Sequence, residues 1–405
     1  MTIKHSETFK PVKPTEQLID FSNTEIAFSD KSDEELKKMA WLFGLMNKAW
    51  LVKLLNPLGL MAVRWHLPFS TRVIKATIFR QFVGGTTLLE SQKVIKRLYD
   101  HNILSILDYG AEAKESEKDF NITMNENIRA IEFAYTHESV PVVSCKITGL
   151  ARFGLLESIQ KGEPFSRETR IEYRNILKRI DSICHVAHEK GVGVFIDAEE
   201  SWIQDAIDHL VYLMMKRYNR KRVIVYNTFQ MYRHDRLQYL MDAHSKAQEE
   251  GYLLGAKLVR GAYMDKERAR AEDLGYPSPI HPNKKATDDA YNLALNYCIQ
   301  HYEEIAICNA SHNEESNMLF AKWIHEKRLP KGHPHLNFCQ LYGMSDHISY
   351  NLANAGYNVA KYLIYGQIEE VVPYLTRRAK ENAAVTGDMS REYELILREI
   401  KRRKL

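Results

Sequence analysis

The sequence predicts an α/β protein, a (β/α)8 TIM-like barrel preceded by a helical N-terminal arm. From about residue 76 onward, short β-branched runs alternate with stretches of helical periodicity, and eight such runs can be counted. Nearly every run ends in a polar side chain able to take part in chemistry. Barrel active sites are assembled from several strand ends in this way. A doubly wound open sheet instead concentrates its chemistry at one switch point, so we favour the barrel.

Each predicted strand is followed by sequence with helical periodicity, the pattern of parallel strands joined by right-handed crossovers. The clearest connections are helices over 201–218 and 287–302, the second with Thr287 as its expected N-cap. The segment 262–286 is long for a loop and is expected to cover the mouth of the barrel. The predicted strands span residues 78–84, 105–110, 140–148, 191–198, 222–228, 255–261, 305–311 and 335–341.

Residues 1–75 are expected to form the arm, and residues 76–405 the barrel with a C-terminal helix. Ser32 and Glu35 have the spacing of a capping box at the start of a helix in the arm. The apolar stretch 39–69 admits two interpretations. A helical hairpin packed on the barrel is favoured, and a helix lying in a membrane interface is the alternative. An ordinary membrane-spanning helix is excluded, because the stretch is interrupted by Lys48, Lys53, Pro57 and Arg64.

The bulk composition excludes several classes of protein. The 405 residues carry a formal net charge of only +4, spread evenly, which argues against a nucleic-acid partner. Five scattered cysteines without a CxxC spacing indicate reduced thiols in a cytosol-like compartment. The first thirty residues resemble neither a secretory signal nor a transit peptide. The Gly-His-Pro-His run at 332–335 comes nearest to a metal motif, but it lacks a carboxylate or thiol companion, so no metal is expected.

Two adjacent arginines near the C-terminus, Arg377 and Arg378, lie on a predicted helix beside an apolar stripe. Tyr374 and Glu381 fall on the same arc of that helix. Guanidinium groups match carboxylate or phosphate oxygens through paired hydrogen bonds, which suits an anionic ligand. The segment taken alone favours a plainer interpretation, a solvated pair between Arg377 and Glu381.

Charged residues at two other strand ends support an anionic ligand. Asp197 follows four apolar residues of a predicted strand, and a carboxylate buried there needs a partner. Lys146 ends another strand, so a structural ion pair between Lys146 and Asp197 is one explanation. Once the arginine pair is added, cations outnumber acids at the mouth, and this surplus implies a bound anion.

The segment KLVRGAY brings two cations, Lys257 and Arg260, to the end of a parallel strand, an element that is usually apolar. Gly261 and Ala262 follow them and let the backbone approach a ligand closely. These features suit phosphates, or a flavin ring that becomes anionic on reduction. His312 at another strand end is less specific, because a lone histidine is more often structural than catalytic.

The motifs KLVRGAY, GYPSPI, ASHN, QLYGM and PYLTRRAKEN together resemble the proline dehydrogenase family. The resemblance is to its FAD-dependent, single-function, eukaryotic-type branch, and it extends from about residue 76 to residue 400 in the family's order and spacing. It implies a distorted (β/α)8 barrel that holds FAD at the carboxyl ends of the strands. The chain has no GxGxxG motif and no P-loop, so the FAD is expected to be held without these devices.

The resemblance also implies roles for particular residues. Lys146, Arg377 and Arg378 are similar to the clamp on the substrate carboxylate. Asp197 is similar to the acidic residue that orients this cluster, and Lys257 to the cation beside flavin N5. The walls of the substrate pocket that the resemblance implies are Leu341 and Tyr362.

The implied cofactor contacts lie at several strand ends. Asn227 stands where many bacterial relatives have a glutamine facing the flavin ring, and its shorter side chain changes its reach. Many bacterial relatives also have arginine in the place of Lys257 and lysine in the place of Arg260, the reverse of this chain. The residues expected to contact FAD are Ala198, Asn227, Arg260, Gly261, Ala262, Ser311 and His312.

The resemblance implies the FAD-dependent oxidation of L-proline to 1-pyrroline-5-carboxylate, with electrons passed to a membrane quinone. The lack of a presequence suits a cytoplasmic location, and peripheral contact with the inner face of the membrane through 39–69 is a further expectation. Two alternatives stay open: a hydroxyproline or other cyclic imino-acid dehydrogenase on the same scaffold, and a non-redox barrel that binds an anionic ligand. Tyr362 is expected to crowd a ring hydroxyl, which favours proline over hydroxyproline.

Overall fold

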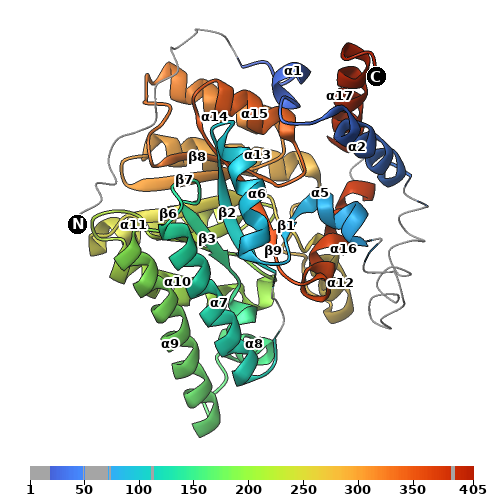
Figure 1. Ribbon diagram of the computed structural model, residues 1–405. Helices are drawn as coiled ribbons and strands as arrows, with labels where there is room; N and C mark the ends of the chain where they lie inside the picture. The colour runs from blue at the N-terminus through green and yellow to red at the C-terminus, as the bar shows by residue number, and fades with distance from the viewer. Residues whose placement is uncertain (1–18, 49, 51–71, 73, 111–113, 385–387) are drawn as a thin grey trace.

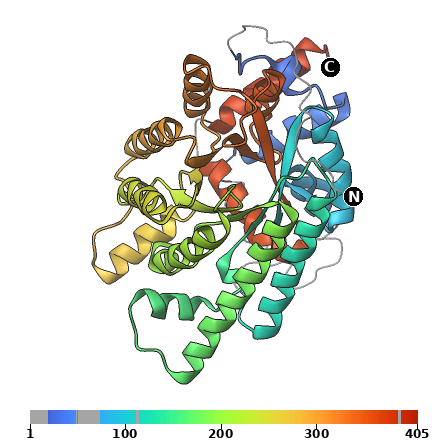
Figure 2. The ribbon, with the colours of Figure 1, turned by 90° about the vertical axis from the view of Figure 1, so that its left-hand side faces the viewer.

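A computed structural model of the protein describes residues 19–48, 50, 72, 74–110, 114–384 and 388–405. Its sheet is a ring of eight parallel strands: β2 (Ile103–Tyr109), β3 (Val142–Cys145), β4 (Gly193–Ile196), β5 (Val225–Gln230), β6 (Leu254–Val259), β7 (Ile305–Ala310), β8 (Leu336–Leu341) and β9 (Asn358–Tyr365). The ring closes because β9 hydrogen-bonds to β8 on one side and to β2 on the other. Helices lie outside the strands (Figures 1 and 2). The predicted (β/α)8 barrel is therefore confirmed.

The first predicted strand, 78–84, is wrong for most of its length. A π-helical turn, η1 (Lys75–Phe79), and a short helix, α5 (Arg80–Phe82), occupy this part of the chain. Only a three-residue strand follows, β1 (Val83–Gly85), which pairs in parallel with the end of β9 beyond the point where β8 stops. The eighth strand of the ring is β9, which the sequence pattern did not predict.

The helices between the strands follow the expected alternation, and the helix predicted over 201–218 is confirmed as α10. The helix predicted over 287–302 begins earlier, because the side chain of Asn283, and not that of Thr287, caps it by accepting a 2.9 Å hydrogen bond from the backbone N–H of Ala286. The segment 262–286, expected to be a loop, contains a helix. The helices after β1 are α6 (Leu88–Tyr99), α7 (Glu117–Tyr135), η2 (Ile147–Gly149), α8 (Phe153–Gln160), α9 (Arg167–Lys190), α10 (Ser201–Tyr218), α11 (Arg236–Glu250), α12 (Met264–Leu274), α13 (Lys284–Gln300), α14 (Glu314–Glu326), α15 (Asp346–Asn354), α16 (Ile368–Ala384) and α17 (Asp388–Arg402).

Side chains alternate between the inside and the outside of the ring, since successive residues of a strand point to opposite faces. On β5, Val225 and Phe229 belong to the apolar layer between the strands and the helices. Tyr226 of the same strand instead packs with Phe195 of β4 and Cys308 of β7 in a second apolar cluster that fills the barrel. The same alternation along each strand decides which polar residues point into the barrel, toward its mouth.

In the part of the N-terminal arm that the structure describes, two helices are formed, α1 (Thr24–Ala27) and α2 (Asp33–Met46). The predicted capping box is confirmed: Ser32 Oγ accepts from the N–H of Glu35, and the Glu35 carboxylate accepts from the N–H of Ser32. One face of α2 buries four large apolar side chains in the same cluster as residues of α17, and each contributes about 1.5–3 kcal/mol. These buried residues are Leu36, Met39, Phe43 and Met46.

Buried charges also hold the arm against the barrel. Lys31 Nζ lies 2.7 Å from Asp30 Oδ2 and 3.1 Å from Asp346 Oδ2 of α15. The other oxygen of Asp346 lies 2.8 Å from the ammonium of Lys361, a fully buried residue on the outer side of β9. The start of the chain is thus linked through two lysines and a carboxylate to the last strand of the ring.

The two interpretations of the stretch 39–69 are decided only in part. Residues 39–46 belong to α2 and pack inward, with Met39, Phe43 and Met46 buried, while most of the remainder lies outside the described residues. Among the helices that the structure describes, none has the length and apolar character needed to cross a bilayer.

Candidate active site

A group of charged and hydroxyl side chains lies inside the carboxyl end of the barrel, and we call it the inner cluster. Its members occupy inward positions at similar heights on neighbouring strands, because Asp108 pairs with Ser144 in register, and Cys145 pairs with Ile196 just before Lys146 and Asp197. In a parallel barrel the carboxyl ends of all strands lie at the same face, so their last inward side chains meet there. The inner cluster comprises Asp108, Ser144, Lys146, Asp197, Lys257 and Tyr362.

Asp197 is the centre of the inner cluster. Its Oδ1 lies 2.6 Å from Lys257 Nζ, and its Oδ2 lies 3.6 Å from Lys146 Nζ. Lys146 also lies 3.4 Å from Oδ2 of Asp108. All four side chains are largely buried, with exposed fractions of 6% for Lys257, 11% for Lys146, 14% for Asp197 and 1% for Asp108. Charges this far from water are stable together only because they compensate one another.

Two hydroxyl groups complete the hydrogen bonding of Asp197. Tyr362 donates from its phenol to Oδ2 at 2.7 Å, and Ser144 donates to Oδ1 at 3.0 Å. The ring of Tyr362 also faces the ammonium of Lys257, whose Nζ lies 4.7 Å from the ring centroid. Tyr362 therefore contacts both partners of the Lys257–Asp197 ion pair, a role beyond that of an apolar wall.

The two carboxylates of the cluster have pKa values displaced in opposite directions. Burial alone raises the pKa of Asp197, but Lys257 and Lys146 lower it more strongly, to about 2. Burial raises the pKa of Asp108 to about 6 against the opposing effect of Lys146. At neutral pH both are ionised, so two lysines and two aspartates make the inner cluster electrically neutral.

A second polar group surrounds Arg260 at the rim of the barrel. Its Nε donates to Asp288 Oδ1 at 2.7 Å, and its two terminal nitrogens donate to Ser311 Oγ at 2.7 Å and to Ser316 Oγ at 2.9 Å. The guanidinium also lies over the ring of Tyr291, 4.4 Å from its centroid. Each terminal nitrogen carries a second N–H, so this fixed guanidinium keeps donors for an anion at the rim.

The backbone after Arg260 has the properties of a cofactor cradle. Gly261 has φ of +140°, and a Cβ there would lie 2.4 Å from the ring of Tyr232, so only glycine fits. Gly261 and Ala262 are both exposed at the rim, and the N–H of Ala262 donates to Gln230 Oε1 at 3.3 Å. An exposed backbone beside a fixed guanidinium fits the phosphates and sugar of a flavin dinucleotide, so these residues are compatible with FAD.

His312 lies at the end of β7 as a neutral ring. Its Nε2 accepts from the N–H of Leu341 at 3.4 Å, which leaves Nδ1 as the donor to Ser345 Oγ at 2.9 Å. Burial and the nearby charges of Lys361 and Arg378 together lower the pKa of His312 to about 3. His312 is therefore not a proton donor near neutral pH.

The arginine pair lies on α16, the helix that follows β9, as predicted. Arg378 is buried, with 8% of its surface exposed, and Arg377 is partly buried. The guanidinium of Arg378 lies 5.3 Å from the ring centroid of Tyr374. The start of α16 is tied to the end of β2 by a 2.7 Å hydrogen bond from the phenol of Tyr109 to Glu370. The helix thus begins at the carboxyl end of the barrel.

The structure does not bring Asn227 into this site. Its side chain is on the outer side of β5, where its Nδ2 donates to Asp208 of α10 at 2.9 Å and its Oδ1 accepts from the N–H of Thr228. The expected position facing the flavin ring is wrong, because the parity of β5 turns Thr228 and Gln230 toward the mouth instead. Ala198 follows Asp197 and is 9% exposed.

Two residues with evident roles at the site were missed from the sequence. Asp108 sits at the end of an apolar strand, the same signal that identified Asp197. Glu199 is buried and accepts hydrogen bonds from the N–H and the hydroxyl of Thr148, at 3.0 and 2.5 Å. It thereby fixes the turn that directly follows Lys146, while burial raises the pKa of Glu199 to about 7.

The segment after β6 borders the mouth as a helix. Glu267 of α12 accepts from the N–H and the hydroxyl of Ser201, both at 2.6 Å, and so caps the start of α10.

Elsewhere, a cavity of about 910 Å³ lies between the arm and the barrel, with Lys31, Trp41 and Arg97 among its lining residues. None of the described residues that line it is a predicted site residue, so it is separate from the inner cluster.

Comparison with known proteins gives the chain a family. The family model described as proline dehydrogenase matches residues 91–391. Proline dehydrogenase 1, mitochondrial, of Caenorhabditis elegans is 40% identical over 243 residues, which are 59% of this chain and 39% of that protein. The chain thus spans about two fifths of that relative's length. Carbapenem antibiotics biosynthesis protein CarD of Pectobacterium carotovorum is 33% identical over 322 residues, 80% of this chain and 83% of that protein.

A solved structure supports the fold. The crystal structure of proline utilization A from Bdellovibrio bacteriovorus, inactivated by N-propargylglycine, superposes with a TM-score of 0.73 at 22% identity. The match covers 90% of this chain and 42% of that one. Proline dehydrogenase 2, mitochondrial, of Arabidopsis thaliana is 30% identical and matches 82% of this chain and 79% of its own length. This chain forms a (β/α)8 barrel and matches the family model over most of its length. It belongs to the proline dehydrogenase family.

Proposed function

We propose that this chain oxidises L-proline to 1-pyrroline-5-carboxylate with FAD as its cofactor and passes the electrons to a membrane quinone. The observation that supports this most directly is the inner cluster, in which Lys146 and Lys257 share the carboxylate of Asp197 inside the barrel. Arg377 and Arg378 of α16 would add positive charge to this neutral cluster, which suits a ligand that brings its own negative charge. Membership of the proline dehydrogenase family supports the choice of proline as that ligand.

The substrate carboxylate needs a positive charge that the inner cluster does not supply by itself, because its two lysines are balanced by two aspartates. We assign the carboxylate to Lys146 together with Arg377 and Arg378 of α16. Two guanidinium groups hold a planar carboxylate through paired hydrogen bonds and so fix its direction. This orientation presents one face of the proline ring and its C5 to the cofactor.

In the reaction, C5 of proline loses a hydride and the ring nitrogen loses a proton, which leaves a double bond between C5 and nitrogen. A flavin bound at the mouth supplies the acceptor for the two electrons. Lys257, held charged by Asp197 and Tyr362, offers a fixed positive charge beside the ring system. Arg260, Gly261, Ala262 and Ser311 are assigned to the dinucleotide.

Proline that binds with a neutral amine needs no general base to form the product. His312 is unsuited to proton transfer near neutral pH because its pKa is lowered to about 3. Asp108, whose pKa is raised to about 6 by burial, is the group in the inner cluster that titrates closest to neutrality. Its assigned role is to hold Lys146, the residue that links it to the substrate carboxylate.

For location, the mitochondrial names of the animal and plant relatives favour an electron acceptor in an inner membrane. We assign peripheral membrane contact to the arm, where Trp41 is 58% exposed and Trp50 is 67% exposed. The stretch proposed for this contact, 39–69, lies mostly beyond the described part of the chain.

The test is a spectrum of the purified full chain under anaerobic conditions, before and after proline is added. We expect a yellow protein whose visible flavin band is lost with one equivalent of product formed per flavin. A parallel titration with hydroxyproline is expected to bleach the band more slowly, because Tyr362 limits space for a ring hydroxyl. A protein that neither holds flavin nor can be reconstituted with FAD would overturn the proposal and favour a non-redox barrel.

A further inference from the structure

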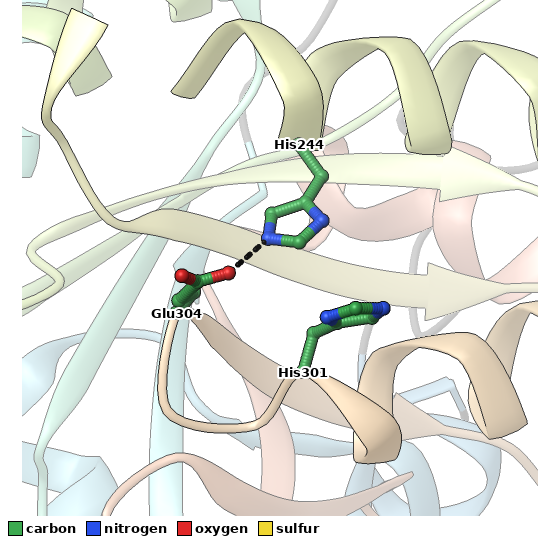
Figure 3. A group of neighbouring side chains, drawn as sticks. All are labelled: His244, His301 and Glu304. Atoms are coloured by element: carbon green, nitrogen blue, oxygen red, sulfur yellow. Dashed lines mark hydrogen bonds and ion pairs between the residues drawn. The ribbon is translucent and has the colours of Figure 1, made fainter. Parts of the chain in front are cut away.

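Three metal-ligating side chains meet at the opposite end of the barrel from the inner cluster. His244, His301 and Glu304 each offer one ligand atom, and these atoms lie within 4.8 Å of one another (Figure 3). We propose that they bind one divalent transition-metal ion, with zinc as the expected occupant. The set was not apparent in the sequence, where His244 is remote from the other two residues.

The ligands come from two rigid elements. His244 is on α11, and the other two are on the turn that joins α13 to β7. That turn is fixed by the backbone, because the carbonyl of His301 accepts from the N–H groups of Glu304 at 3.0 Å and Ile305 at 2.9 Å. The carbonyl of Glu304 accepts from Leu254 at the start of β6. The site is therefore built at the amino ends of two neighbouring strands.

The separation of the His244 and Glu304 ligand atoms is close to that which a tetrahedral ion requires, and His301 has to bring in its ligand atom from within 4.8 Å of the other two. Nε2 of His244 lies 2.8 Å from Oε2 of Glu304. Two ligand atoms about 2.0–2.2 Å from a zinc ion are about 3.3 Å apart at the tetrahedral angle. The pair thus has to open by only a few tenths of an ångström, and the Glu304 side chain is 48% exposed and can move, while His244 is 2% exposed and fixed.

The surrounding hydrogen bonds are of the kind that support metal ligands. The phenol of Tyr297 lies 2.8 Å from Nδ1 of His244, and so fixes the ring with Nε2 directed at the site. Gln248 donates to Oε2 of Glu304 at 2.8 Å. Two imidazoles and one carboxylate leave a fourth position for water, a donor set that suits zinc better than calcium or magnesium.

A metal at this place would act on stability. It would clamp α11 to the turn before β7, whereas the chemistry of a parallel barrel lies at the other face. Binding to the folded chain alone raises the unfolding temperature in proportion to the logarithm of the metal concentration. The inference is independent of the proposed function, because it concerns neither proline nor flavin.

The test is a calorimetric titration of zinc chloride into the full chain, purified without a metal-affinity tag and stripped with a chelator. We expect one ion per chain. His301→Ala and Glu304→Gln are each expected to weaken binding at least tenfold, because each removes one of three ligands. Glu303→Gln, which neutralises the adjacent exposed carboxylate, is the matched control and should bind like the wild type.

A second measurement covers the case of a variant with altered folding. Zinc should raise the thermal unfolding midpoint of the wild type and of Glu303→Gln equally, and raise that of Glu304→Gln clearly less at the same zinc concentration. Absence of saturable binding to the wild type would overturn the proposal. So would an affinity equal to that of the wild type in both His301→Ala and Glu304→Gln, since the ion would then be held elsewhere on the chain.

Discussion

Tyr362 of β9 and Asp197, directly after β4, are joined by a 2.7 Å hydrogen bond from the phenol to the carboxylate. Oδ1 of the same carboxylate lies 2.6 Å from Lys257 Nζ. Tyr362 of β9 therefore fixes an ion pair between residues of two other strands, Asp197 at the end of β4 and Lys257 on β6. The bond lowers the pKa of Asp197, together with the larger effects of the lysines. The precision of the inner cluster thus depends on β9, the strand that completes the ring.

Replacement of this tyrosine by phenylalanine tests that dependence. Tyr362→Phe should lower kcat/KM for proline roughly tenfold or more, because a hydrogen bond to a charged group is worth about 1.5–3 kcal/mol. The acid limb of the pH profile should also move to higher pH as Asp197 becomes easier to protonate. Tyr226→Phe is the control, since that ring lies in the same barrel and packs on Phe195 at 4.9 Å. Equal effects of the two variants would contradict the assigned role.

Asp108 should influence stability in a pH-dependent manner. Burial raises the pKa of Asp108 from 3.8 to about 6 in the folded protein. The folded state therefore keeps a proton that the unfolded chain releases, and the contribution of this group is present below about pH 4 and lost as the pH rises through about 6. Asp108→Asn cannot titrate, so its unfolding free energy relative to the wild type should rise by up to about 3 kcal/mol between these limits.

The measurement for Asp108→Asn is urea unfolding at a series of pH values. Asp100→Asn is the control, because Asp100 is exposed and pairs only at the surface with Lys96, at 2.8 Å. A constant difference between Asp108→Asn and the wild type across the whole range would show that the raised pKa is not present in the folded state.

The clamp is tested by Arg378→Lys. A lysine keeps the charge but loses the second parallel hydrogen bond, so KM for proline should rise about tenfold while kcat changes little. Arg391→Lys on α17 is the matched control, because its side chain is 41% exposed and pairs with Glu314 at 3.1 Å. An unchanged KM in Arg378→Lys would remove this arginine from the clamp.

Gly261 is expected to be essential for flavin retention. Its φ is +140°, and a methyl group added there would lie 2.4 Å from the ring of Tyr232, so Gly261→Ala must displace the rim backbone. We expect the ratio of flavin to protein to fall at least several-fold in the purified variant. Gly275→Ala also forces a residue at positive φ, of +68°, but meets no atom within 4 Å, and should retain flavin. Loss of flavin in both variants would indicate general destabilisation.

Most of the fold was predictable because seven of the ring strands are short apolar runs separated by helical sequence. The segment 78–84 was misassigned because seven residues are too few for the spacing of apolar side chains to distinguish a strand from a helical turn. β9 was missed because Lys361 interrupts its apolar sequence. Only the structure shows that this lysine is neutralised outside the ring by Asp346, at 2.8 Å.

The inner cluster was predictable in part for a related reason. Lys146, Asp197 and Lys257 stand out as charges in apolar strands, and the structure brings them together. The direction of Asn227 was not predictable, because a strand buried on both faces gives no signal of which residues point inward. The link from Tyr362 to Asp197 joins residues 165 positions apart, and no local pattern records it.

The late position of β9 in the chain has a consequence for biosynthesis. Asn358–Tyr365 is bonded to β8, to β2 and, at its tip, to β1. A nascent chain still lacking these residues on the ribosome exposes two unsatisfied strand edges at once, those of β2 and β8. Such edges recruit foreign strands, so termination or nicking ahead of residue 358 should yield aggregates, and cellular yield should depend on chaperones until translation is nearly complete.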